Sequence, residues 1–412
     1  MKFLLINLFF PPDGAPTGVL LADVAEALAA EGHEVHVLCA GAWYAYAGQA
    51  SEFRSHGIQV EYVKAPSFGH GTLFRLSCYA SFYWAALRRA LFGMKYDVVL
   101  TLTTPPLLSL IGTLMKSLRG TRHYIWEMDL YPDIAVDLGF FRRGFPAELV
   151  VGLLADFSRR RADRVIALAE SMRSRLLRRG IPDEKIAVSE NWADGARIFP
   201  RPFPPDHPLT VLYSGNLGRA HDWETIADAM PKLSDASRYW FVFAGFAPRF
   251  ELLWQRCWHS DVSNVLFLAY QEQDRISGHL GNCHVGLVTQ KTETRGSVVP
   301  SKTYALMAAG RPFIFVGPAG GGPALVAERF GCGWRVEPGD APALVQLIEK
   351  LAASPELVRD AGARAYAAFL EHYDVPHGAG RILEILGVSR AKGANEAAEQ
   401  GVNSAACHSE SA

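Results

Sequence analysis

Short apolar runs alternate with longer helical stretches along most of this chain. Near the N-terminus, an apolar run at 3–8 is followed by a glycine-containing loop, a helical stretch at 19–30 and a second apolar run at 34–38. This order predicts a strand, a helix and a parallel strand joined by a right-handed crossover. The first run is short, carries one lysine and lacks a small-residue cleavage site, so we interpret it as a buried strand and not as a signal peptide.

The alternation continues in two blocks that a proline-rich segment separates. Residues 199–208, FPRPFPPDHP, hold too many prolines for a helix or a central strand and therefore predict a linker. Before it, strands are predicted within 96–103, 122–129, 161–180 (followed there by a basic helix) and 185–194. After it, they are predicted within 209–218, 239–245, 264–270, 284–290, 311–317 and 333–338, with a helix starting at Asp222.

This order predicts an α/β protein with two facing, Rossmann-like domains, each a doubly wound parallel sheet. We place the N-terminal domain at 1–198, the C-terminal domain at 209–370, and a C-terminal helix, which can return to the N-terminal domain, at 371–388. The tail at 389–412 is small and polar, a composition typical of disorder. Ligands bind at the carboxyl ends of such strands, so we expect the site in the cleft between the domains.

Composition excludes several classes of protein. Of the 412 residues, 49% are apolar and 20% charged, as in soluble globular proteins, and the net charge of −1 argues against a nucleic-acid partner. Six scattered cysteines form no C-x-x-C pair, which favours reduced thiols in a cytoplasmic protein. No run of eighteen apolar residues is present, so no membrane-spanning helix is predicted.

Two glycine-containing loops each lead from a strand to a helix. The first, FFPPDGAPTG, has Gly14 and Gly18, which admit a ligand close to a helix N-terminus; an ordinary tight turn is the alternative. It does not match G-x-G-x-x-G, so a dinucleotide site is unsupported. The second loop holds two glycines, an asparagine and two basic residues: Gly215, Asn216, Gly218, Arg219 and His221. Its amides and cation suit a phosphate, unless His221 or Asp222 merely caps the helix.

A third candidate is the stretch SVVPSKTYALMAAGRP at 297–312. It predicts a loop and then a helix beginning at Pro300, with Ser297 or Ser301 satisfying the first amides. Lys302 lies beside the positive end of the helix dipole, where acids are usual, so an external anion is expected there. The alternative is a lysine that is simply solvated.

These motifs carry a resemblance to a known family. SGNLGRAHD and VPSKTYALMAAGRP, following FFPPDGAPTG, resemble the retaining glycosyltransferases of family 4, in particular the bacterial surface-polysaccharide and O-antigen sugar transferases. The resemblance covers roughly residues 1–385. It implies a GT-B fold, a UDP- or GDP-linked sugar held mainly by the C-terminal domain, and an acceptor held mainly by the N-terminal domain. It also implies chemistry without a metal or cofactor, and no Asp-x-Asp motif is present.

The resemblance assigns donor binding to residues of both C-terminal motifs: Gly215, Asn216, Gly218, Arg219, His221, Gly296, Ser297, Val299, Ser301 and Lys302. The family typically has two glutamates eight positions apart, and here Ser297 and Ala305 stand at those positions. Its usual arginine and lysine fall at Asn216 and His221. We therefore expect Arg219, Lys302 and backbone amides to meet the phosphates, and Ser297, Thr303 or the backbone near Gly296 to meet the hydroxyls.

Acidic residues follow the strand predicted at 122–129. In the family this region supplies a residue near the reacting sugar, so Asp129 and Glu127 are the catalytic candidates. Either would hydrogen-bond the acceptor or stabilise oxocarbenium character at the sugar. The alternative is that these acids cap the next helix.

Aromatic and basic residues cluster in the first half of the chain. Residues 72–96 are rich in aromatic side chains before Arg88 and Arg89, and residues 141–180 hold ten arginines against four acids. This combination suits the anionic inner leaflet of a membrane and an acceptor linked to a polyprenyl diphosphate. The alternative is that the aromatics are core and the arginines a solvated face.

The sequence therefore predicts a cytoplasmic, peripheral membrane glycosyltransferase that acts with retention in surface-polysaccharide synthesis. Two alternatives stay open. A non-hydrolysing nucleotide-sugar 2-epimerase has the same two-domain architecture and would epimerise its substrate without an acceptor. An inactive scaffold in polysaccharide assembly is suggested by Ser297 and Ala305.

Overall fold

The computed structural model describes residues 1–40, 53, 55–63, 72–245, 248–269, 271 and 275–388. The tail predicted to be disordered, 389–412, lies outside the described residues. The chain forms two compact units. One comprises Met1–Leu100, Met115–Tyr124 and Ala379–Ala412, and the other comprises Thr101–Leu114 and Ile125–Gly378. The domain boundaries expected from the sequence stay a prediction.

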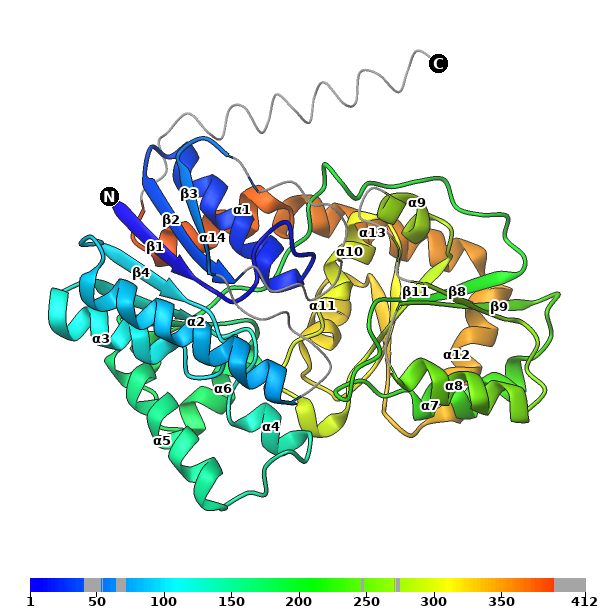
Figure 1. Cartoon of the computed structure of the whole chain (residues 1–412). Helices are drawn as coiled ribbons and strands as arrows, with labels where there is room; N and C mark the ends of the chain where they lie inside the picture. Colours follow the sequence, from blue (N-terminus) through cyan, green and yellow to red (C-terminus); the bar gives the residue numbers. More distant parts are fainter. Residues whose placement is uncertain are drawn as a thin grey trace, which may run out of the picture. The chain divides into compact units, whose positions relative to one another are not determined.

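The first unit is built on parallel strands with a helical crossover (Figure 1). Strand β1 (Lys2–Ile6) pairs with β2 (Glu34–Ala40), and β2 pairs with β3 (Ile58–Val63), all in parallel. Helix α1 (Pro16–Ala30) begins three residues before the predicted start, because Pro16 suits the first helical turn, where its missing N–H is not needed. The other helices with residues in this unit are α2 (Thr72–Phe92), α3 (Ser109–Arg119) and α14 (Val375–Ile385).

These strands belong to a seven-stranded sheet with the order β3-β2-β1-β4-β5-β6-β7. Its remaining strands are β4 (Val98–Thr101), β5 (Arg122–Trp126), β6 (Arg164–Ala167) and β7 (Ile186–Val188). The chain runs outward from β1 in one direction and then from β4 in the other, which is the doubly wound arrangement expected from the sequence.

The second unit contains a six-stranded sheet with the same type of order, β10-β9-β8-β11-β12-β13. Every pairing is parallel. The strands are β8 (Leu209–Ser214), β9 (Tyr239–Ala244), β10 (Val265–Leu268), β11 (Val285–Thr289), β12 (Phe313–Val316) and β13 (Gly333–Val336). The prediction of two doubly wound parallel-sheet α/β arrangements is confirmed.

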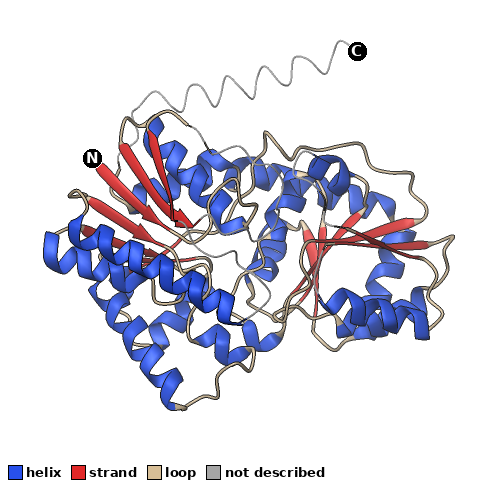
Figure 2. Cartoon of the chain, in the orientation of Figure 1, coloured by secondary structure: helices blue, strands red, loops and turns tan. Residues whose placement is uncertain are grey.

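Helices cover both faces of this six-stranded sheet (Figure 2). One core cluster joins the strands to α7 (Glu224–Ala229), α8 (Pro248–His259) and α12 (Ala341–Ala353). The other joins them to α9 (Ile276–Gly281), α10 (Lys302–Ala308), α11 (Gly322–Phe330) and α13 (Pro355–His372). Burial from both sides explains why β11 and β12 are continuous apolar runs without polar alternation.

Helix α10 lies closely against β11. A Cβ atom at Gly286 of β11 would stand 2.2 Å from Leu306 Cδ1, so only glycine fits there. The helix begins at Lys302 and not at Pro300, and Ser301 makes no side-chain capping bond. The close packing fixes the position of Lys302 relative to the strand ends of the sheet.

The second unit also holds three helices that follow β5 and β6. They are α4 (Asp133–Asp137), α5 (Pro146–Arg161) and α6 (Glu170–Arg178). The strand predicted at 122–129 ends at Trp126, although the Glu127 amide still donates to Ile166 O of β6 at 2.9 Å. The segment from 127 to 132 therefore leaves the sheet edge and leads into α4.

Candidate active site

The loop after β8 approaches Lys302 closely. Gly215 has φ +115°, a conformation that favours glycine, and a Cβ atom there would stand 2.7 Å from Lys302 Cε and displace the end of that side chain. Lys302 Nζ lies 3.4 Å from Asn216 O, 3.4 Å from His221 Nε2 and 5.0 Å from the centre of the Tyr213 ring. The structure thus brings together two of the sequence motifs at one point of the sheet.

Burial shifts the pKa of both basic groups at this point. Desolvation lowers the pKa of Lys302 to about 8. Desolvation also lowers the pKa of His221 well below its usual value, and the charge of Lys302 lowers it further. His221 is therefore neutral near pH 7, with Gly218 N donating to its Nδ1 at 3.0 Å. Lys302 is a poorly solvated cation, and an anionic ligand would compensate its charge.

Asp222, two residues before α7, accepts at Oδ1 a bond of 3.1 Å from Thr225 N in the first turn of that helix. The suggestion that His221 is the cap is therefore wrong, and its ring instead faces Lys302. Arg219 is exposed and lies over the Phe140 ring at 4.7 Å.

Sequence reasoning missed a third basic residue, Arg249, in the first turn of α8. Its charge acts on His221 and contributes to the lowered pKa of that ring. Among the described residues, no hydrogen-bond acceptor meets its buried Nε atom. Arg249 follows β9 and Gly245 at the start of α8, a strand–glycine–helix order like that of β8 and Gly215, and this glycine is the sequence signal that could have pointed to it.

The segment before α10 is fixed by contacts within the second unit. Gly296 has φ +79°, and a Cβ atom there would stand 2.4 Å from Ser171 O of α6. Ser297 is fully buried; its Oγ donates to Asp137 Oδ2 at 2.6 Å, and its carbonyl accepts from Leu130 N at 2.8 Å. Because Ser297 bonds Asp137 and Ser301 forms no cap, the expectation that either serine satisfies the first amides of α10 is wrong.

Two further predicted donor residues lie in this packed region. Val299 is buried, 3.1 Å from the position that a Cβ atom of Gly322 would take, so it packs against the start of α11. Thr303 is buried, and its Oγ1 has no hydrogen-bond partner in the described part of the chain.

The two catalytic candidates have different surroundings. Glu127 is buried in a two-pronged ion pair with Arg159, with Nε–Oε1 at 2.7 Å and Nη2–Oε2 at 3.3 Å. Asp129 is partly buried, and burial, followed by the charge of Glu127, raises its pKa to about 6. Neither acid caps α4, because Pro132 occupies the position before that helix. Glu127 is held by its partner, whereas Asp129 has the perturbed pKa typical of functional carboxyl groups.

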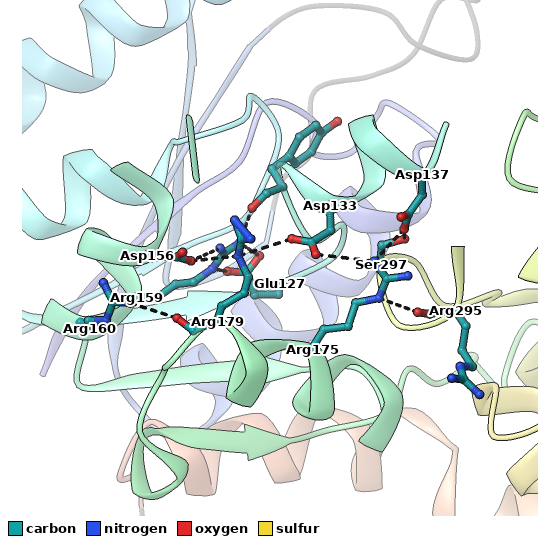
Figure 3. Close-up of polar contacts among 11 residues, drawn as sticks. Glu127, Asp133, Asp137, Asp156, Arg159, Arg160, Arg175, Arg179, Arg295 and Ser297 are labelled. Carbon is teal, nitrogen blue, oxygen red and sulfur yellow. Dashed lines mark hydrogen bonds and ion pairs between the residues drawn. The ribbon is translucent and has the colours of Figure 1, made fainter. Parts of the chain in front are cut away.

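Charged residues of α4, α5 and α6 form one network that reaches the loop of Ser297 (Figure 3). Arg175 pairs with Asp137 at 2.8 Å and donates to the carbonyl oxygens of Glu293 and Arg295, both at 2.6 Å. Arg179 joins Asp133 to Asp156 of α5, at 3.4 and 3.1 Å. The network therefore anchors the segment 293–297, which precedes Lys302 closely in the sequence.

In the first unit, the loop holding Gly14 and Gly18 is closed by its own contacts. Asp13 Oδ1 accepts from Ala15 N at 2.9 Å, and Tyr62 Oη donates to Pro11 O at 2.6 Å. A Cβ atom at Gly18 would stand 3.0 Å from the backbone of Phe10. The glycine at position 18 is therefore explained by the close packing of α1 on the loop. This agrees with the alternative that the loop is an ordinary tight turn.

Two family models match consecutive parts of this chain. Residues 17–192 match the glycosyl transferase 4-like domain, and residues 196–368 match glycosyl transferases group 1. The chain is 25% identical over 265 residues to the “Probable glycosyltransferase WbjE” of Pseudomonas aeruginosa, spanning 62% of this chain and 66% of that protein. It is 27% identical over 404 residues to the “Putative colanic acid biosynthesis glycosyl transferase WcaI” of Escherichia coli (strain K12), spanning 89% and 95%.

Solved structures share the fold. Sucrose-phosphate synthase from Thermosynechococcus elongatus superposes with a TM-score of 0.73 at 17% identity, covering 94% of this chain and 98% of that one. Anabaena Alr3699/HepE in complex with UDP-glucose superposes with a TM-score of 0.69 at 17% identity, covering 94% and 99%. The two doubly wound sheets are thus those of the GT-B fold. The chain belongs to the glycosyltransferases whose 4-like and group 1 domains it carries.

Proposed function

We propose that this protein transfers a hexose, with retention, from a UDP- or GDP-linked donor to a polyprenyl-diphosphate-linked saccharide during surface-polysaccharide synthesis. The observation that carries this proposal is the poorly solvated Lys302 beneath the Gly215 loop. Two comparisons support it: WcaI is named for colanic acid biosynthesis, and the HepE structure contains UDP-glucose.

The largest charge in such a transfer develops on the leaving diphosphate. When the bond from the sugar C1 to the phosphate oxygen breaks, the electron pair stays with the diphosphate, and fixed cations and amides stabilise it. Lys302 and Arg249, which both act on His221, suit this role, together with the backbone amides of the Gly215 loop. Arg219, at the exposed edge of the same loop, adds a further cation.

Asp129 is the group we assign to the acceptor. In its ionised form it accepts a hydrogen bond from the acceptor hydroxyl, or stabilises positive charge at the sugar C1. Its pKa of about 6 leaves it mostly ionised at neutral pH. Glu127 then acts indirectly, because its charge raises the pKa of Asp129 while its own carboxylate is held by Arg159.

The lipid-linked acceptor and the inner membrane face stay proposals. On α5, apolar side chains at a spacing of four residues are exposed: Phe145, just before the helix, then Leu149, Leu153 and Phe157. Arg160 and Arg161 follow at the same helix end, and such a pattern suits the surface of an anionic leaflet. Across the helices of the described residues, none has the length and apolarity needed to cross a bilayer.

Incubating the purified protein with UDP- and GDP-sugars tests the proposal. Release of nucleotide from one donor, with thermal stabilisation by the matching nucleotide, is the expected result. Epimerised sugar nucleotide without an acceptor would favour the 2-epimerase, and nucleotide binding without turnover would favour the scaffold. We also propose that no metal or cofactor takes part, so that EDTA leaves turnover unchanged.

A further inference from the structure

A cavity of about 620 Å³ lies in the second unit beside the charged network. This volume falls within the range typical of ligand pockets. Its wall is formed by residues of α4, the segment leading into α5, α6 and the loop after β11: Asp133, Val136, Asp137, Arg143, Gly144, Glu148, Leu149, Arg175, Arg178, Arg179 and Glu293.

On one part of this wall the charged side chains already compensate one another. Asp133, Asp137, Arg175 and Arg179 pair with one another at 2.8 to 3.5 Å, and Ser297 adds its bond to Asp137 (Figure 3). These side chains are mostly buried, at 7 to 18% exposed. They form a rigid polar surface without a net charge, which suits neutral hydroxyl groups better than an isolated ion.

On the other part of the wall the charged side chains have no partner of opposite charge among the described residues. Arg143, Arg178 and Glu293 are exposed, and none makes an ion pair with any described residue, whereas Glu148, a further carboxylate of this wall, accepts from Gly144 N at 3.0 Å. Two guanidinium groups provide the planar donors that phosphate oxygens accept. The carboxylate of Glu293 is a strong acceptor for a sugar hydroxyl.

Contacts place this cavity next to the loop assigned to the donor phosphates. Lys291 N donates to Ala220 O at 2.8 Å, which ties the strand end before Glu293 to the Gly215 loop. Arg219 of that loop lies over Phe140, which is three residues before Arg143. A sugar in the cavity would therefore be a neighbour of the donor, as transfer between two bound substrates requires.

The cavity also meets the apolar row of α5. Leu149 belongs both to the cavity wall and to the exposed row that continues through Leu153 and Phe157. A ligand with a polar head and an apolar chain would contact both surfaces at once.

Resting on the proposed function, we infer that this cavity is the acceptor subsite and takes a saccharide diphosphate joined to a lipid. Arg143 and Arg178 bind the diphosphate, Glu293 binds a sugar hydroxyl, and the chain lies along the α5 row. The donor seat at Lys302 is a separate part of the same unit.

Farnesyl diphosphate serves as a probe for this subsite. The donor phosphate site at Lys302 is first saturated with UDP or GDP, whichever of the two stabilises the protein. We expect the probe to bind the wild type, and Arg143→Ala and Arg178→Ala to weaken binding about tenfold or more, as loss of a charge-assisted bond does. Arg142→Ala is the matched control, since this exposed arginine is absent from the cavity wall, and it should bind as the wild type does. No binding by the wild type, or equal binding by all three variants, overturns the inference.

The same preparations separate this inference from the proposed function. Nucleotide binding and slow donor hydrolysis by the wild type test the donor chemistry alone, and their absence would end the proposed function. If both persist in every variant while farnesyl diphosphate binding is unaffected, only the acceptor subsite fails. In transfer assays, Glu293→Gln should raise the acceptor KM with an unchanged donor KM, whereas Glu328→Gln, an exposed acid of α11, should change neither.

Discussion

Ser297 and Asp137 share a hydrogen bond of 2.6 Å that joins the loop after β11 to α4. The family resemblance expects a glutamate at position 297. In this chain the carboxylate beside that position is supplied by Asp137, more than a hundred residues earlier, and Arg175 holds it at 2.8 Å.

Ser297→Ala removes the hydroxyl donor from Asp137. We expect the free energy of unfolding to fall by about 1–3 kcal/mol, because a buried acceptor loses a partner. Urea denaturation measures the change, and Ser174→Ala on the exposed side of α6 is the control. Equal stability of the two variants would show that the bond does not contribute to the fold.

Glu127→Ala leaves Arg159 buried without its main partner. Arg159 keeps its ion pair with Asp156 at 2.9 Å, so we expect a loss of about 1–3 kcal/mol in the free energy of unfolding, as for removal of charge-assisted hydrogen bonds. Adding Arg159→Met should recover part of that loss. A fully stable Glu127→Ala variant with reduced turnover would instead assign Glu127 a direct role in catalysis.

Asp129 should control the acid limb of the pH profile. Because its pKa is about 6, kcat/KM for transfer should fall roughly tenfold per pH unit below that value. Asp129→Asn should lower turnover at every pH and abolish this limb, while Asp360→Asn, on α13, should keep the wild-type profile. An acid limb that survives in Asp129→Asn belongs to another group.

The same pKa predicts a change of stability with pH. A carboxyl group whose pKa is raised on folding favours the fold below its unfolded value of 3.8 and opposes it above about 6. Asp129→Asn should therefore be more stable than the wild type at pH 7 to 8, by on the order of 1–3 kcal/mol. The difference should vanish near pH 4, and a gain independent of pH would contradict the assignment.

The α5 row predicts binding to anionic vesicles. Leu149→Gln and Leu153→Gln should each reduce binding to phosphatidylglycerol vesicles about tenfold at low salt, because each removes apolar area from the interface. Leu370→Gln, a similarly exposed leucine of α13, should bind as the wild type does. Flotation measures all three, and a wild type that stays unbound would exclude the membrane proposal.

Much of the fold could be predicted from the sequence, because buried parallel strands are apolar runs that glycine-containing loops and helices separate. The Gly215 loop and Lys302 were singled out because both adjoin helix starts, and their role in donor binding stays a prediction. The exact start of α10 was not, since Pro300 suits a helix start and yet precedes the helix by two residues.

The partners of the acidic residues could not be predicted from sequence. Arg159 pairs with Glu127 and Arg175 with Asp137 across separations of more than thirty residues, and only the packing of α4, α5 and α6 sets these pairs. Arg249 and the cavity beside Arg143 depend in the same way on how helices lie on the sheet. The local pattern showed that charges were abundant at 141–180 but not which of them were paired.

Lys302 offers the most direct test of the central claim that the Gly215 loop and α10 form the donor phosphate seat. The affinity for the matching nucleoside diphosphate should be measured by titration calorimetry between pH 7 and 10 for the wild type and Lys302→Met. We expect the variant to bind at least about tenfold more weakly at pH 7, as loss of a charge-assisted bond implies, and wild-type affinity to fall above the pKa of about 8, where the lysine loses its charge. Equal affinity of the two proteins across this range would contradict the account.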